Sequence, residues 1–174
     1  MAGQGSHRIP TGSRRPSRTS AYAGGMTAPT AARALLEDLV DEFLRDYPRG
    51  ARLLAVASPS ADRSAAFAGG LAAALRARGV TVSVAAADDR DEARLRAEFV
   101  TPFRAAGGDA VEIVSGSTAL LAERTRGLWH FSVWLIDGDE VPHTAATALV
   151  DVTDPEAPTR RLADYCAVPP SFLT

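Results

Sequence analysis

The chain has 174 residues, is 46% hydrophobic and carries a formal net charge of −2. This length fits one domain with a core of its own, and the near-neutral charge argues against a general nucleic-acid-binding protein. The one cysteine, Cys166, excludes an internal disulfide and a cysteine-rich metal cluster. No apolar stretch approaches the roughly 20 residues that span a bilayer, so we expect a cytoplasmic protein with no membrane partner.

Residues 1–28 are rich in glycine, serine, threonine, arginine and proline, a composition typical of a disordered tail. The tail is basic, and it is either an arm for an acidic partner or, as we favour, an unstructured leader. Its arginines are Arg8, Arg14, Arg15 and Arg18. We expect a single α/β domain over 29–158 and a C-terminal tail over 159–174, with a short helix and coil.

The first half of the expected domain contains two helices around one strand. Apolar residues recur at helical spacing over 30–47, which predicts an amphipathic helix. The apolar run over 53–57 predicts a strand buried on both faces. The next helix should be capped by Asp62 and end at Gly79. Its sheet-facing residues are Phe67, Leu71 and Leu75.

The second half continues the alternation. Residues 80–86 predict a strand, and Asp88 and Asp89 follow its carboxyl end, at the rim where α/β proteins bind ligands. The pair is either a catalytic base or magnesium ligand, or only the loop before a helix marked by Asp91, Leu95, Phe99 and Phe103. Further strands are predicted over 111–114, 129–136 and 147–152. The alternation predicts a three-layer α/β domain with a mainly parallel sheet.

The turn between the first strand and its helix is where a phosphate most often binds. A phosphate loop has the pattern G-x-x-x-x-G-K-[ST], in which backbone N–H groups and the lysine hold phosphates and the hydroxyl holds magnesium. In register, the chain has Ala57-Ser58-Pro59-Ser60-Ala61-Asp62-Arg63-Ser64. Only Ser64 fits, because Asp62 adds a negative charge and Pro59 removes a donor. Since all 19 basic residues are arginines, no lysine elsewhere can substitute.

The order of several stretches over roughly 52–154 resembles the uridine kinase and phosphoribulokinase branch of the P-loop kinases. LLAVASPSADRSAAFAGGLAAALRARG is similar to the first strand, phosphate loop and helix, and VTVSVAAADD to the second strand with its acidic end. LLAERTRGLWHFSVWL, the most specific match, is similar to a later helix and strand, and LVDVTDPEAP to the closing strand and its turn. The resemblance implies a P-loop NTPase-like domain.

The resemblance also implies roles for individual residues. Asp88 or Asp89 would be the catalytic carboxylate near the acceptor hydroxyl, and Ser64 would hold magnesium. The nucleotide contacts would come from Ser60, Asp62, Arg63 and Ser64.

Other family features are missing. The acid-glycine pair of the family is Ser115-Gly116 here, the acceptor-binding loop after residue 89 is almost absent, and the arginine-bearing lid between residues 136 and 147 is reduced to about ten residues.

Two hypotheses follow. The first is a degenerate uridine kinase-like domain that has lost phosphotransfer and acts as a binding or regulatory protein with a protein partner. Its contact surfaces would be the rim and the helix over 30–47. The alternative is an active nucleoside or small-metabolite kinase that uses ATP and magnesium through an atypical phosphate loop. Thiol or metal chemistry at Cys166, His7, His130 and His143 is disfavoured, because nothing gives the histidines a ligand spacing.

Overall fold

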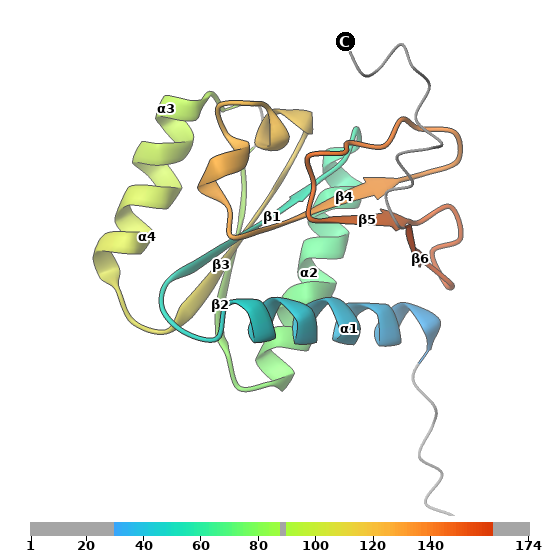
Figure 1. The fold of residues 1–174 in the computed structure, drawn as a ribbon, viewed down its shortest axis with the longest axis horizontal. Helices are drawn as coiled ribbons and strands as arrows, with labels where there is room; N and C mark the ends of the chain where they lie inside the picture. The colour runs from blue at the N-terminus through green and yellow to red at the C-terminus, as the bar shows by residue number, and fades with distance from the viewer. Residues whose placement is uncertain (1–29, 88–89, 162–174) are drawn as a thin grey trace, which may run out of the picture.

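Strands and helices alternate along the chain, and the computed structural model describes residues 30–87 and 90–161. The six-stranded sheet has the order β2-β3-β1-β4-β5-β6 (Figure 1). Neighbours from β2 to β5 are parallel, and β6 is antiparallel to β5. The strands are β1 (Arg52–Ala57), β2 (Thr81–Ala86), β3 (Ala110–Gly116), β4 (Phe131–Ile136), β5 (Ala148–Asp151) and β6 (Thr159–Arg161).

The described helices are α1 (Ala31–Asp46), α2 (Ala61–Ala77), α3 (Glu92–Leu95), the π-helical η1 (Arg96–Val100), α4 (Thr101–Ala106) and the 3₁₀ helices η2 (Thr118–Leu121) and η3 (Arg126–Leu128). No helix in the part of the chain that the structure describes is long and apolar enough to cross a membrane.

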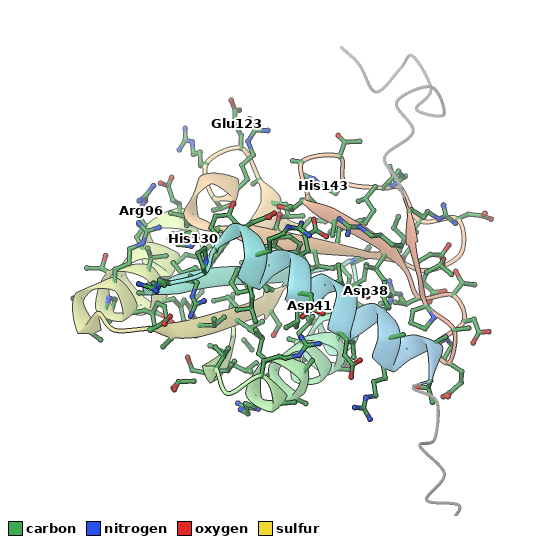
Figure 2. The ribbon with its side chains drawn as sticks, turned by 60° about the horizontal axis from the view of Figure 1, so that its bottom comes forward. Asp38, Asp41, Arg96, Glu123, His130 and His143 are labelled. Atoms are coloured by element: carbon green, nitrogen blue, oxygen red, sulfur yellow. The ribbon has the colours of Figure 1, made fainter. Side chains whose placement is uncertain are left out.

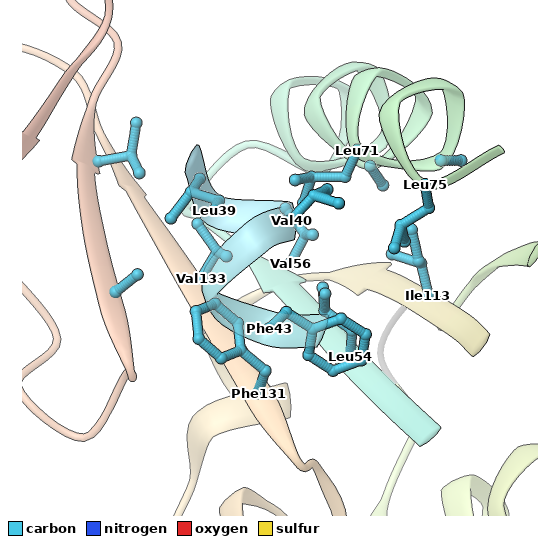
Figure 3. Close-up of a cluster of buried hydrophobic side chains, with 14 of the residues drawn as sticks. Leu39, Val40, Phe43, Leu54, Val56, Leu71, Leu75, Ile113, Phe131 and Val133 are labelled. Atoms are coloured by element: carbon cyan, nitrogen blue, oxygen red, sulfur yellow. The ribbon is translucent and has the colours of Figure 1, made fainter. Parts of the chain in front are cut away.

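Both faces of β1 are buried, as its apolar run predicts. Leu54 and Val56 join the core under α1 and α2, where Phe43 and Leu71 pack against them (Figure 3). The other residues of β1, Leu53, Ala55 and Ala57, join a second core on the opposite face of the sheet. This core also contains Leu95, Val100, Leu120, Leu121 and Trp134. The prediction of a three-layer α/β domain is therefore confirmed.

Helix α1 forms where the apolar spacing predicts a helix. Thr30 caps it by accepting the Arg33 N–H through its hydroxyl at 3.3 Å. Its apolar residues are buried against the sheet and α2, so the polar side is left for solvent. Asp38 and Asp41 lie on this outer side (Figure 2).

The predicted cap of α2 is wrong. Ser60, not Asp62, is the N-cap, and its hydroxyl accepts the Arg63 N–H at 3.4 Å. Because Ser60 has extended backbone angles and the helix begins directly after it, Asp62 lies inside the first turn, where its charge favours the positive end of the helix dipole. Gly79 ends the helix with a φ of 77°, as expected.

A helix forms after residue 90 as the sequence predicts, and the structure shows that Asp91 is its N-cap. The Asp91 carboxylate accepts the Arg94 N–H at 2.9 Å. In its middle the Thr101 N–H donates to the Arg96 carbonyl, the longer bond of a π turn, and Pro102 directly follows with no N–H of its own.

A second correction concerns the start of the expected C-terminal tail. Thr159–Arg161 form β6 rather than a helix or coil. Ion pairs tie this strand to its neighbours, since Arg161 contacts Asp151 of β5 and Arg160 contacts Glu42 of α1. β6 extends the sheet beyond residue 158, whereas residues 1–29 and 162–174 lie outside the described part. The division of the chain at 28 and 158 stays a prediction.

Candidate functional site

The candidate site is the loop between β1 and α2, at the carboxyl edge of the sheet (Figure 1). We call residues 58–60 the β1–α2 loop. Ser58, in this loop, and Ser64, in the first turn of α2, are fully buried, with exposed fractions of 0%. Buried polar groups of this kind must be satisfied inside the protein.

The backbone N–H groups of the loop are directed to partners inside the protein. The Ser58 N–H donates to the Gly116 carbonyl at 3.3 Å, and the Ser60 N–H donates to the Ser58 hydroxyl at 3.1 Å. The Arg63 N–H donates to the Ser60 hydroxyl at 3.4 Å, and the Ser64 N–H to the Ser60 carbonyl at 3.1 Å. Pro59 has no N–H. Four N–H groups of the stretch that aligns with a phosphate loop are therefore already bonded here.

The Ser64 hydroxyl is also turned inward. Its oxygen lies 2.9 Å from the Gly116 carbonyl and 3.2 Å from the Ser60 carbonyl. The Ser58 hydroxyl lies 2.9 Å from the Ser64 hydroxyl and 2.5 Å from the Ser60 carbonyl. The predicted magnesium ligand thus sits in a buried network that joins the start of α2 to the end of β3.

Arg63 contacts two carboxylates of the turn after β4. We call residues 137–140 the acidic turn. Arg63 Nη1 and Nη2 lie 2.5 Å and 3.1 Å from the two Glu140 oxygens, and Nη2 lies 3.2 Å from Asp137. The hydrogen bond with Glu140 raises the pKa of Arg63, and the same bond lowers the pKa of Glu140. The one basic side chain of the candidate motif is thereby paired with acids.

Hydrogen bonds within the acidic turn and to Thr153 hold the acidic turn in place. Glu140 also accepts the Asp137 N–H at 3.0 Å, and the Gly138 N–H donates to the Thr153 hydroxyl at 2.7 Å. Thr153 donates its own hydroxyl proton to Asp151 at 2.6 Å, and this bond lowers the pKa of Asp151. The network runs from the first turn of α2 to the residues after β5.

The predicted catalytic acids, Asp88 and Asp89, lie outside the described residues, and their role stays a prediction. Before them, Ala87 is buried and its N–H donates to the Ser115 carbonyl at 2.8 Å. Ser115, at the acid-glycine position, is buried and its hydroxyl lies 3.4 Å from the Ala85 carbonyl. The serine hydroxyl therefore contacts the neighbouring strand β2.

An open cavity of about 610 Å³ lies beside this edge, between the start of α3 and the segment after η2. Its lining is mixed in charge and consists of Arg90, Asp91, Glu92, Ala93, Ala119, Ala122, Glu123, Arg124 and Thr125. Glu123 projects outward from this rim (Figure 2). The charged residues that line the cavity therefore include both signs.

The histidines do not form a site in the described part of the chain. His130 and His143 lie at separate places (Figure 2), and His7 and Cys166 lie outside the described residues. His130 accepts the Leu53 N–H at 3.0 Å, and His143 packs its ring 5.4 Å from that of Trp134. Among the described residues, no three His, Cys, Asp or Glu side chains are grouped so that they could hold a metal ion.

The structure thus brings Ser60, Arg63 and Ser64 together and leaves Asp62 exposed. The analysis of the sequence missed the main partners of these residues, Glu140 and Ser58. A sequence signal existed for the first, because the run Asp137-Gly138-Asp139-Glu140 concentrates acids in one turn while the motif holds a single arginine.

Comparison with known proteins finds solved structures with a similar fold. No family model matches the chain, and no curated protein matches it. A possible uridine kinase from Bacillus stearothermophilus has a similar structure, with a TM-score of 0.50 and 14% identity over 62% of this chain and 82% of that one. The chain has a P-loop kinase-like fold. A proposed fructose transport system kinase from Silicibacter sp. TM1040 was also found, with a TM-score of 0.41 and 20% identity over 66% of this chain and 76% of that one.

This result confirms the predicted fold class and the structural resemblance to uridine kinase-like proteins. At 14% identity the similarity concerns the P-loop kinase-like fold alone, so function must be argued from the residues of the site.

Proposed function

We propose that this P-loop kinase-like domain does not transfer phosphoryl groups and acts as a binding or regulatory protein for a protein partner. The observation that carries the proposal is the closed β1–α2 loop with the first turn of α2, where the N–H groups of Ser58, Ser60, Arg63 and Ser64 are bonded inside the protein.

Phosphoryl transfer depends on positioning and charge neutralisation, and the protein does little covalent chemistry. Removal of one preorganised donor typically lowers kcat by about 100-fold to 1,000-fold. Here several donors are engaged at once, and the hydroxyl of Ser64 is buried among carbonyl groups. The combined loss supports a domain without kinase activity.

The charge around the loop supports the same proposal. Asp137 and Glu140 contact Arg63, and Asp62 and Asp139 are exposed acids that neighbour these residues in sequence. A nucleoside triphosphate would bring further negative charge close to these carboxylates, and like charges repel. No lysine exists in the chain to offset it.

A protein partner would have to use exposed surface rather than the apolar face of α1. That face is buried against α2 and the sheet, with Leu39, Val40 and Phe43 at or below 1% exposure. The polar outer side of α1, with Asp38 (Figure 2), and the carboxyl rim of the sheet are therefore the surfaces we propose for the contact.

A thermal-shift titration of the full chain with ATP and GTP, with and without magnesium, tests the proposal. A ligand that binds only the folded state must raise Tm. Because we propose that the loop holds no nucleotide, we expect no change in Tm up to millimolar ATP or GTP. An active P-loop kinase measured in parallel controls for the assay. A saturable, magnesium-dependent rise would overturn the proposal and support the alternative of a kinase with an atypical phosphate loop.

A further inference from the structure

The contact between Arg63 and Glu140 has the geometry of an arginine bound to a phosphate. Two guanidinium nitrogens face two oxygens, at 2.5 Å and 3.1 Å. This fork-to-fork arrangement is the one with which arginine binds either a carboxylate or a phosphate. Both side chains are mostly shielded, with 21% of Arg63 and 28% of Glu140 exposed.

The acidic turn holds this carboxylate in place from behind. The Asp137 N–H donates at 3.0 Å to Glu140 Oε2, the oxygen that also accepts from Arg63 Nη1. The Glu140 N–H donates to the Asp137 carbonyl at 3.2 Å. Gly138 supplies the left-handed φ of 59° that the turn needs, and its N–H is fixed by Thr153 at 2.7 Å. Glu140 is therefore a positioned group and not a side chain that meets Arg63 by chance.

We propose that Glu140 is an internal substitute for a phosphate group, whose carboxylate occupies the anion position on Arg63 and keeps inorganic and nucleotide phosphates out of the β1–α2 loop. This inference rests on the proposed function, because a domain that no longer transfers phosphate has no external anion for its arginine. It adds a second cause, which can be reversed: the anion position on Arg63 is filled by one side chain from a turn 77 residues away in sequence.

A phosphate that approaches Arg63 must displace Glu140 and then lie beside Asp137, which is 3.2 Å from the same guanidinium. Removal of the Glu140 charge lifts the main barrier and leaves the positive charge of Arg63 and the start of α2 to attract an anion. Hydrogen bonds to charged groups are typically worth a factor of about 10 to 100 in an equilibrium constant. We expect a gain of this size.

The test is pyrophosphate binding to the full chain, measured by isothermal titration calorimetry at pH 7 and constant ionic strength. Wild type and E140Q are compared with D139N, a matched control in the same acidic turn. Asp139 is exposed and has no ion pair with Arg63, but its substitution changes the net charge by the same amount. The double variant E140Q/R63Q removes the proposed anion contact itself.

We expect E140Q to bind pyrophosphate with a Kd about 10-fold to 100-fold lower than wild type. D139N should behave as wild type, and R63Q should abolish the gain in the E140Q background. If natively folded E140Q binds no better than wild type, or if D139N gains as much, the proposal is overturned. Should E140Q fail to fold by circular dichroism, E140A takes its place, because it also removes the carboxylate; the same gain is expected, and no gain overturns the proposal.

These outcomes are separate from those of the proposed function. Wild-type chain that binds ATP with magnesium contradicts the proposed function whatever E140Q does. Wild-type chain that binds no ATP, together with an E140Q variant that binds no pyrophosphate, removes only the role of Glu140 and leaves the proposed function standing.

Discussion

The Ser64 hydroxyl lies 2.9 Å from the Gly116 carbonyl, a contact that joins the first turn of α2 to the last residue of β3. Both Ser64 and its neighbour Ser58 are fully buried. A serine at this position of a phosphate loop would coordinate magnesium. In this chain its hydroxyl lies among the Gly116 and Ser60 carbonyls and the Ser58 hydroxyl.

Replacement of Ser64 by alanine should therefore destabilise the protein. The Gly116 carbonyl and the Ser58 hydroxyl each lose a buried partner, which costs about 1–3 kcal/mol in the free energy of unfolding. Urea denaturation measures the change. Ala65→Ser on the exposed side of α2 serves as the control, with a change within about 0.5 kcal/mol. An S64A variant as stable as wild type would contradict a structural role.

The cap of α2 distinguishes two neighbouring residues. Ser60→Ala removes the hydroxyl that accepts the Arg63 N–H, so we expect a loss of about 1 kcal/mol in the free energy of unfolding. Asp62→Asn removes only a charge in the first turn, which is worth about 0.3–1 kcal/mol and is screened by salt. Denaturation at low and high salt separates the two effects. A larger cost at Asp62, independent of salt, would restore it as the cap.

Much of the fold was predictable because local pattern and burial agree. The run over 53–57, the helical spacing over 30–47 and the glycine after α2 each specify one local structure, and each prediction is confirmed. The cap was missed because serine and aspartate are about equally good at an N-cap, and only the backbone angles of Ser60 decide between them.

The candidate site was less predictable because its contacts are long-range. Arg63 and Glu140 are 77 residues apart, and Ser64 and Gly116 are 52 apart, so no local spacing signals either contact. β6 was missed for the same reason. Its exposed, charged residues have no strand pattern of their own, and the strand forms by pairing with β5 and by ion pairs to Asp151 and Glu42.

Phe43 should be the most sensitive core position of α1. It is fully buried and packs against Phe131, with ring centroids 5.8 Å apart (Figure 3). Phe43→Ala should lower the free energy of unfolding by about 3–5 kcal/mol, because it removes buried area and leaves a cavity. Arg45→Ala on the exposed side of the same helix should change it by less than about 0.5 kcal/mol. Equal effects in chemical denaturation would show that α1 does not pack as described.

Acid should weaken the fold through its histidines. Burial is the main cause that holds the pKa values of His130 and His143 below their usual value of 6.5. The unfolded chain therefore binds protons at these two histidines more readily than the folded chain does. The stability that comes from keeping both rings neutral is complete above pH 6.5 and declines as the pH falls through their lower pKa values in the folded state.

His143 gives a specific test of this pH dependence. Its ring packs on Trp134, and its buried Nδ1 has no hydrogen-bond partner among the described residues. His143→Phe keeps an aromatic ring at this place and removes the titrating group, so Tm should fall less than in wild type between about pH 7 and pH 5. An unchanged slope would show that His143 does not contribute.

The most direct test of the closed β1–α2 loop is amide NMR of the full chain, with ATP and magnesium added to millimolar concentration. We predict slow hydrogen exchange for the amides of Ser58, Ser60, Arg63 and Ser64, and resonances that nucleotide does not shift. Saturable shifts of these four amides on addition of ATP and magnesium would show that the loop opens to hold phosphate, and would contradict a domain without phosphotransfer.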